Sequence, residues 1–336
     1  MPGELTSLLA AGVCAAVVTA AEPVLIPLLR RAAIDTPNMR SSHSVPTPRG
    51  GGAAIATGLV AATLLLMHGT VAMTFAAAVA AFAAIGFADD LAALPAGRRL
   101  TMQGLASLAI AGVLVGRIGL PPTVLAAGVV AVAIWLIGFV NAFNFMDGVN
   151  GISAAHALIG GLAYACLGWL RPDAFLATAG AAVAAGALAF LPWNAVRARV
   201  FLGDAGSYGL GVALAVLAAY CVIRGIPLEA ALAPLGLYLA DTAWTLQRRV
   251  RAGERVFEAH RTHTYQQLCD VGWSHQRVTV TTAAVTAAAC VLGAASLTGH
   301  QALRAGADLV ALGLLVAYLH APVLLGRPRE LVEAAG

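Results

Sequence analysis

The sequence predicts an all-α membrane protein: a polytopic bundle of about eleven transmembrane helices that forms a single domain over residues 1–336. Of all residues, 60% are hydrophobic and 11% are charged, whereas ordinary soluble domains are roughly 25% charged. The mean hydropathy is +0.84. The apolar residues form long runs instead of the amphipathic periods of soluble helices. These observations exclude a soluble α/β protein.

Gly, Pro and charged residues separate the apolar runs and give each predicted span its limits. The predicted spans are 5–29, 51–68, 70–88, 100–116, 122–140, 152–170, 174–192, 205–223, 226–246, 278–298 and 304–325. The first span is expected to be retained, because the stretch MPGELTSLL lacks the positive segment of a cleavable signal.

The distribution of arginine predicts the orientation of the bundle. All 20 basic residues are arginine, and 16 of them fall on one side of the predicted spans. Because positive residues collect on the cytoplasmic side, the N-terminus is expected in the periplasm and the C-terminus in the cytoplasm. The loops that then share the cytoplasmic face, and are expected to build an active site, are 30–50, 89–99, 141–151, 193–204 and 247–277. The basic excess therefore indicates a membrane topology and no nucleic-acid partner.

Asp89 and Asp90 close the third predicted span, in the stretch AAIGFADDL, and no basic residue follows before Arg98. Carboxylates at a helix C-terminus face the unfavourable end of the helix dipole. A single Asp there is typical of a solvated helix end, but a pair at the membrane surface favours a functional site.

The stretch GFVNAFNFMDGVNG ends the fifth span with polar residues at intervals of three, namely Asn141, Asn144, Asp147 and Asn150. If the helix continues through them, they share one face. Asn and Gly also end helices for purely structural reasons, but four polar groups on one face favour a ligand site.

Asp204, in the stretch FLGDAGS, precedes the eighth span. It is either a helix N-cap or part of an anion site at a helix N-terminus, where free N–H groups face a phosphate. Asp204, Asp147 and Asn144 together supply hard oxygen ligands that suit Mg²⁺, with Mn²⁺ as an alternative. The sequence has no HExxH motif and no cysteine cluster for zinc.

The last long loop, 247–268, combines a run of arginines with His260, Arg261 and His263. Arginines beside a membrane often contact anionic lipid head groups. The His-Arg-x-His run points instead to phosphate binding, because a guanidinium binds phosphate with two parallel hydrogen bonds and histidine can donate another. Acids for a metal and basic groups for a diphosphate predict phosphoryl transfer between a soluble nucleotide donor and a lipid.

The residues resemble the polyprenyl-phosphate N-acetylhexosamine-1-phosphate transferases, the MraY/WecA-like members of glycosyltransferase family 4. The matching segments, in order over almost the whole chain, are DTPNMRSSHSVPTPRGGG (35–52), GFADD (86–90), NAFNFMDGVNG (141–151), FLGDAGS (201–207) and AHRTHTYQQL (259–268). The resemblance implies transfer of a sugar-1-phosphate from a UDP-N-acetylhexosamine to undecaprenyl phosphate in the bacterial inner membrane, with release of UMP. Its implied partners are these two substrates and membrane lipid, with a homodimer as one option for the assembly.

By the same resemblance, Asp89 and Asp90 bind or activate the lipid phosphate, and Asp89 is the candidate base. Asp204 coordinates Mg²⁺, with Asn144 and Asp147 beside the metal and the nucleotide. The remaining residues that the resemblance assigns to catalysis or substrate binding are His263, His260, Arg261, Asn150, Arg49 and His43.

Two departures from the family's pattern bear on the substrate. Asn150 stands where many bacterial members have a second Asp, so a role that requires charge is not expected there. The last loop reads HRTH instead of a triple histidine, which disfavours a muramoyl-pentapeptide donor. It looks like the branch that initiates O-antigen or related surface polysaccharides, with N-acetylglucosamine or a 6-deoxy-N-acetylhexosamine as the sugar.

Two other classes fit the composition less well. A transporter of a phosphorylated or nucleotide-linked solute would place polar groups near mid-span and would show an inverted repeat, and the sequence shows neither. A lipid phosphotransferase with CDP-activated donors requires an Ala-Arg pair after Asp-Gly, which GVNGISAAHAL lacks. The sequence leaves two mechanisms open: direct attack by the lipid phosphate, or a covalent intermediate on a carboxylate.

Overall fold

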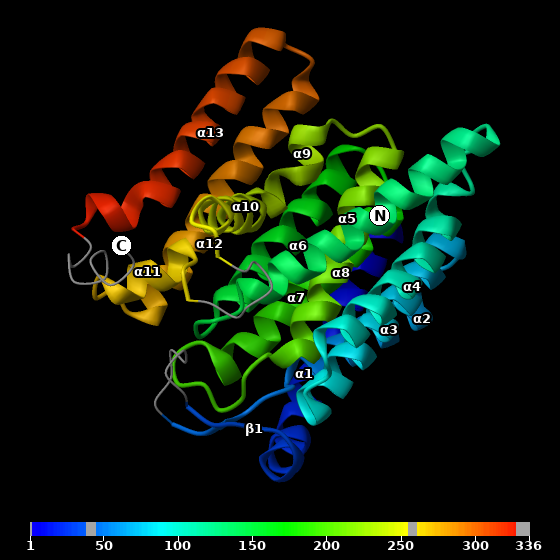
Figure 1. Ribbon diagram of the computed structural model, residues 1–336. Helices are drawn as coiled ribbons and strands as arrows, with labels where there is room; N and C mark the ends of the chain where they lie inside the picture. Colours follow the sequence, from blue (N-terminus) through cyan, green and yellow to red (C-terminus); the bar gives the residue numbers. More distant parts are fainter. Residues whose placement is uncertain (1, 38–44, 255–260, 327–336) are drawn as a thin grey trace.

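The computed structural model describes residues 2–37, 45–254 and 261–326, and this part of the chain is a bundle of helices (Figure 1). Its strands are β1 (Ile34–Asp35) and β2 (Thr47–Pro48), which pair antiparallel. The prediction of an all-α membrane bundle is therefore confirmed.

The helices follow the predicted spans closely. In chain order they are α1 (Pro2–Ala32), α2 (Gly52–Leu66), α3 (Thr70–Ala92), α4 (Ala96–Val115), α5 (Pro122–Phe145), α6 (Ile152–Leu170), α7 (Ala174–Asn194), α8 (Gly203–Ile223), α9 (Leu228–Leu232), η1 (Ala233–Leu235), α10 (Gly236–Arg251), α11 (Thr264–Asp270), α12 (His275–Ala294), η2 (Ala295–Thr298) and α13 (Gln301–Leu324).

Within the described residues, eight helices are long and apolar enough to cross a membrane. They are α1, α3, α5, α6, α7, α8, α12 with η2, and α13. Of the other three predicted spans, α2 is apolar but shorter, and α4 carries Arg98 and Arg99 in its first turn.

The predicted span 226–246 is not one continuous helix. It is divided into α9, η1 and α10, with Pro234 in the short 3₁₀ segment. Proline has no N–H to continue the hydrogen-bond ladder, which explains the break at this point. The second part, α10, is amphipathic and ends in Arg248, Arg249 and Arg251.

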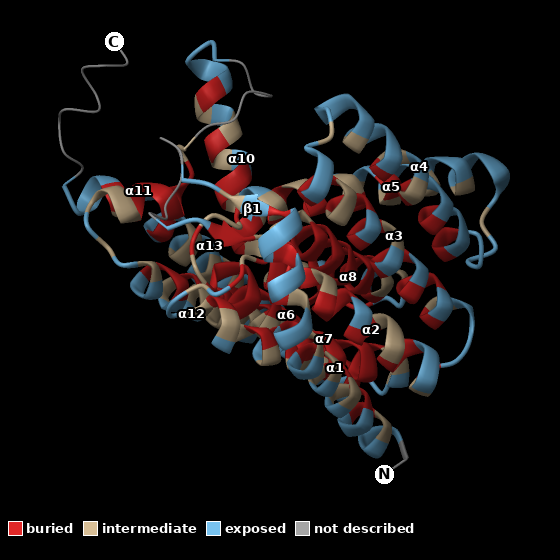
Figure 2. Cartoon of the chain, turned by 90° about the horizontal axis from the view of Figure 1, so that it is seen from below, coloured by how far each residue is buried: buried red, intermediate tan, exposed pale blue. Residues whose placement is uncertain are grey.

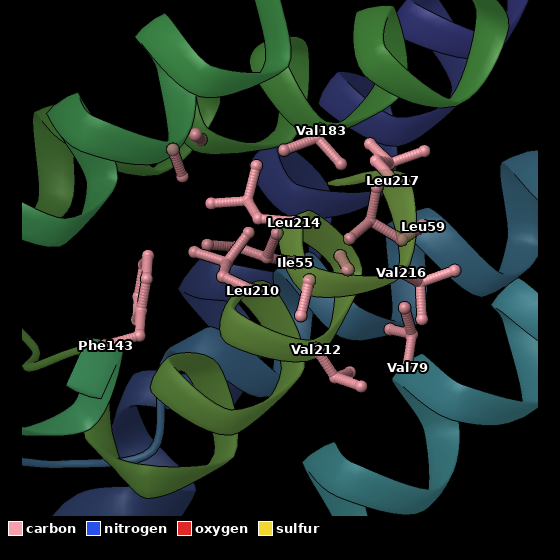
Figure 3. Close-up of a cluster of buried hydrophobic side chains, with 14 of the residues drawn as sticks. Ile55, Leu59, Val79, Phe143, Val183, Leu210, Val212, Leu214, Val216 and Leu217 are labelled. Carbon is pink, nitrogen blue, oxygen red and sulfur yellow. The ribbon is translucent and has the colours of Figure 1, made fainter. Parts of the chain in front are cut away.

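Helix α8 forms the centre of the bundle. In the most apolar stretch of α8, 83% of the residues are buried inside the protein, whereas the corresponding share for α13 is 17%. Side chains from α2, α3, α5 and α7 converge on α8 in the close-up of the core (Figure 3). The cartoon coloured by burial agrees, because α8 is largely buried and the outer helices alternate between buried and exposed residues (Figure 2).

Glycines allow α2 and α3 to approach the backbone of α8. A Cβ atom on Gly52 would collide with the main chain of Gly206, and one on Gly86 would collide with the main chain of Asp204. Side chains would push the helices apart at both places. The end of α3 and the start of α8 are thereby brought into direct contact.

Candidate active site

A polar cavity of about 240 Å³ lies where the end of α5, the start of α8 and several loops meet. Its polar lining residues are Asp35, Arg49, Asp90, Asn144, Asp147, Asn150, Asn194, Asp204, Gln266 and His275. Segments from all five loops that the sequence placed on one face contribute to this lining.

Asp90 joins α3 to the first turn of α8. Its two carboxylate oxygens accept hydrogen bonds from the main-chain N–H groups of Asp204 and Ala205, each at 3.0 Å. Arg49 donates to the main-chain carbonyl of Asp90 at 2.9 Å from Nη2, and its Nε lies 3.7 Å from the carboxylate. The expectation that free N–H groups at the start of α8 face a phosphate is therefore wrong for these two groups, since Asp90 already occupies them.

Asp89 is also buried and fully engaged. Its Oδ2 forms an ion pair with Arg99 at 2.8 Å and accepts from the hydroxyl of Tyr208 at 3.4 Å. Its Oδ1 accepts from the main-chain N–H of Leu94 at 2.7 Å, where α3 ends. The sequence separates Asp89 from Arg99 by ten residues, but α4 folds back and brings the two together.

Asp204, in the first turn of α8, contacts the end of α5. Its Oδ1 accepts a hydrogen bond from Nδ2 of Asn144 at 2.6 Å, and the same nitrogen donates to Ser207 at 2.9 Å. The negative charges of Asp89 and Asp90 also act on the carboxyl group of Asp204. Neighbouring carboxyl groups require a shared proton or a bound cation to offset their repulsion.

Asp147 follows the end of α5 in a tight loop. Burial raises the pKa of Asp147 to about 7, the negative charge of Asp90 contributes in the same direction, and a hydrogen bond to Ser153 opposes both. The loop is covered by Tyr265, whose hydroxyl donates to the carbonyl of Phe145 at 3.1 Å. A Cβ atom on Gly148 would collide with that hydroxyl, which explains the glycine.

The interpretation of Asn141, Asn144, Asp147 and Asn150 as one helix face is wrong. Helix α5 ends at Phe145, so the last two residues lie in the following loop. Asn141 donates to Gln103 on α4 at 2.8 Å and is not part of the cavity lining. Three of these four residues, namely Asn144, Asp147 and Asn150, therefore line the cavity.

Asn150, Asn194 and His275 line the cavity on the side of α12. The main-chain N–H of Asn150 donates to His275 at 3.4 Å. Asn194, at the end of α7, accepts from the N–H of Gly151 at 2.7 Å and donates to the carbonyl of Val200 at 3.0 Å. Asn194 thereby fixes two cavity loops to each other.

The predicted site residues of the last loop that the structure describes, His263 and Arg261, do not line the cavity. His263 is buried outside the cavity lining, with Nδ1 3.2 Å from Asp241. Arg261 pairs with Asp270 at 3.1 Å at the far end of α11. His260 and His43 lie outside the described residues.

A larger groove of about 1070 Å³ adjoins the cavity, and both are lined by Asn150, Phe201 and His275. The groove carries three arginines, namely Arg30, Arg197 and Arg199. The small cavity carries four carboxylates, Asp35, Asp90, Asp147 and Asp204, against the single arginine Arg49. An acidic cavity thus opens beside a basic groove.

The donor set of the small cavity fits a hard divalent cation. Its excess of carboxylates needs a positive charge, and its oxygen donors are of the type that Mg²⁺ prefers. Within the described residues, no three His, Cys, Asp or Glu side chains converge closely enough to hold a metal by themselves. Mg²⁺ does not require such a cage, because it retains waters and shares its coordination with substrate phosphates.

Comparison with known proteins assigns the chain to a family. The model of glycosyl transferase family 4 matches residues 71–222. The decaprenyl-phosphate N-acetylglucosaminephosphotransferase of Mycobacterium tuberculosis is 32% identical over 324 residues, which cover 82% of this chain and 78% of that protein. The chain belongs to glycosyl transferase family 4, in the group of polyprenyl-phosphate N-acetylhexosamine-1-phosphate transferases.

Two other relatives of this glycosyl transferase family 4 member differ in how far the similarity extends. A protein of Bacillus subtilis named "Probable undecaprenyl-phosphate N-acetylglucosaminyl 1-phosphate transferase" is 28% identical over 279 residues, which cover 75% of each chain. The phospho-N-acetylmuramoyl-pentapeptide-transferase of Anoxybacillus flavithermus is 34% identical over 171 residues, about half of each chain (50% and 51%).

Sequence reasoning missed several polar residues of this family 4 site. Asp35, Asn194, Gln266 and His275 line the cavity, and Asp241 holds His263 from behind. Asp35 and Gln266 stand inside the matching segments 35–52 and 259–268, but nothing in those segments singles them out from their polar neighbours. His275 and Asp241 lie on α12 and α10, outside every matching segment. Asn194 directly precedes the basic loop 195–200, which was a further usable signal.

Proposed function

We propose that the protein transfers an N-acetylhexosamine-1-phosphate from a UDP-sugar to undecaprenyl phosphate. The products are UMP and the undecaprenyl-diphosphate-sugar that starts a cell-surface polysaccharide. The supporting observation is the acidic cavity with Arg49 and the adjoining arginine-lined groove, in a chain of a family whose named members are such transferases.

The reaction is a displacement at phosphorus. An oxygen of the lipid phosphate forms a bond to the β-phosphorus of the UDP-sugar, and the bond between that phosphorus and the bridging oxygen of UMP breaks. The sugar keeps its bond to the transferred phosphate. The energy barrier is lowered mainly by positioning and by neutralising the charge of the phosphates.

Asp204, Asp147 and Asn144 are the residues proposed to hold Mg²⁺, with Mn²⁺ as an alternative. The ion would neutralise the diphosphate and polarise its oxygens. Arg49 is placed to bind a phosphate oxygen, because it lines the cavity and its side chain is one-third exposed (34%).

Asp89 is the proposed base, and the ion pair with Arg99 holds its carboxylate in place. Because Asp90 already holds the first turn of α8, its proposed part is to position Asp204. A UDP-sugar exceeds the small cavity, since pockets for ligands of this size are about 300–1,000 Å³. We assign the rest of the donor to the basic groove.

The donor is proposed to carry N-acetylglucosamine or a 6-deoxy-N-acetylhexosamine, in a pathway of O-antigen type. The relatives named for N-acetylglucosamine match three quarters or more of the chain, whereas the muramoyl-pentapeptide relative matches half of it. The arginine asymmetry supports a bacterial inner-membrane protein with the cavity at the cytoplasmic face. A transporter is not proposed, because the named relatives are transferases.

The decisive experiment is UMP release by purified protein with undecaprenyl phosphate and a panel of UDP-N-acetylhexosamines, with and without Mg²⁺. Mg²⁺-dependent release with one donor is the expected result and names the sugar. Release without the lipid acceptor would indicate a hydrolase. Failure of a folded sample with every donor, combined with no UDP binding, would refute the proposed function.

A further inference from the structure

Asp241 on α10 is a fully buried carboxylate outside the cavity, and no motif of the sequence singled it out. We propose that Asp241 is a positioning residue: it fixes His263 and the start of α11, and through them the loop that carries Asp147. The inference rests on the proposed function and adds a residue to it.

The carboxylate of Asp241 gathers three elements. Its Oδ1 accepts from the main-chain N–H of Thr264 at 3.0 Å and from the hydroxyl of Thr245 at 3.2 Å, and it lies 3.2 Å from Nδ1 of His263. Its Oδ2 accepts from the hydroxyl of Tyr318 on α13 at 3.1 Å. A buried carboxylate is stable only when it is fully hydrogen-bonded, and Asp241 meets this condition.

The pair also fixes the tautomer of His263. A carboxylate oxygen and an unprotonated ring nitrogen would repel each other at 3.2 Å, so the proton is assigned to Nδ1. Nδ1 then donates to Asp241, and the imidazole is held in one orientation. A carboxylate behind a histidine has this effect in metal sites and catalytic triads.

From His263 the contacts lead to the cavity. The main-chain N–H of His263 donates to the side chain of Gln266 at 3.1 Å, and Gln266 lines the cavity. Tyr265, the second residue of α11, donates to Phe145 and lies against Gly148. Phe145 and Gly148, which flank Asp147 on its two sides, are therefore contacted by a helix whose first turn is bound to Asp241.

The test is Asp241→Asn, which keeps the size of the side chain and removes its charge. The expected result is a kcat about tenfold to 100-fold lower with a nearly unchanged donor KM, as for the loss of other residues that orient a site from behind. The double variant with His263→Gln should be no slower than the slower single variant, because the two residues act as one unit. An unchanged kcat, or losses that multiply, would overturn the inference.

Tyr318→Phe is the matched control, since it removes a hydrogen bond to the other oxygen of the same carboxylate. It should lower the melting temperature and leave kcat within about twofold. If Asp241→Asn and Tyr318→Phe lower kcat equally, Asp241 only stabilises the fold.

Amide hydrogen exchange provides a readout that does not require activity. Residues 145–150 should exchange faster in Asp241→Asn and as in the wild type in Tyr318→Phe. Unchanged exchange at 145–150 would refute the inference, even if the wild type transfers no sugar phosphate and the proposed function fails. If Asp241→Asn does not fold, His263→Gln is measured in the same way, with the same two outcomes.

Discussion

The two halves of the site are held together in different ways. Where α3 meets α8, glycines bring main chains into contact, and Asp90 closes the first turn of α8. Where α10, α11 and α13 meet, side chains reach one buried carboxylate, Asp241. The first arrangement tolerates almost no added volume, whereas the second depends on one charge. The α3–α8 junction should therefore be disrupted by mutations that add volume, and the cluster around Asp241 by mutations that remove its charge.

The largest effect is expected from Gly86→Ala. Its Cβ would collide with the main chain of Asp204, so α3 and α8 must separate at the cavity. We expect a loss of roughly 3 kcal/mol in the free energy of unfolding, together with loss of transfer activity. Thermal unfolding and UMP release measure both.

Gly104→Ala on α4 is the control for this change, because nothing lies within 4 Å of the added Cβ. It should be neutral or stabilising by up to about 1 kcal/mol, as alanine favours a helix over glycine. Equal losses in both variants would show that the α3–α8 contact is not special.

Next in size is Asp204→Asn, which removes a charge from the junction without adding volume. Transfer should fall at least about 100-fold, because a group that stabilises transition-state charge is lost. The melting temperature should remain close to that of the wild type, because the amide can still accept from Asn144. Asp89→Asn should lower transfer by a similar factor, because the proposed base is lost, and should also lower the melting temperature, because its ion pair with Arg99 is broken. Activity near the wild-type level in either variant would refute the role proposed for that residue.

The pH dependence of metal binding tests the loop between the two halves. The pKa of Asp147 is raised from 3.8 to about 7, so the carboxyl is protonated below that pH in the metal-free protein. Because Mg²⁺ binds the ionised form, its affinity should fall by about tenfold for each pH unit below 7 and stay constant above it. Calorimetric Mg²⁺ titrations between pH 5.5 and 8 measure this slope.

The same shift has a consequence for stability. A carboxyl with a raised folded-state pKa stabilises the folded protein below that pKa, so the metal-free protein should lose stability as the pH rises from about 4 to about 7. Asp147→Asn should remove the part of both pH effects that this carboxyl contributes. A wild-type affinity that stays constant down to pH 5.5 would contradict the proposed coordination by Asp147.

The smallest effect is expected from Tyr265→Phe, which removes the hydrogen bond between α11 and the end of α5. One such bond contributes about 1 kcal/mol, so transfer should slow by roughly fivefold. Tyr220→Phe is a matched control, since its hydroxyl bonds to Asp173, which caps α7 at the loop between α6 and α7. That variant should keep full activity, and equal slowing would indicate a general effect on the bundle.

The class of the protein, the limits of most helices and the loops that meet at the site could all be predicted from the amino-acid sequence. Membrane-spanning helices can be predicted from long apolar runs, because a bilayer sets the length and polarity of each helix independently of its neighbours. The cavity residues Asp90, Asn144, Asp147 and Asp204 were also predicted, because carboxylates and amides at the ends of apolar helices have a high cost.

The contacts of each polar group became known from the folded structure alone. It paired Asp89 with Arg99, turned Asn141 toward Gln103, and placed His263 against Asp241. These partners lie on different helices, and their contacts depend on how closely the backbones approach. That approach is set by glycines at helix crossings, whose partners no local pattern reveals.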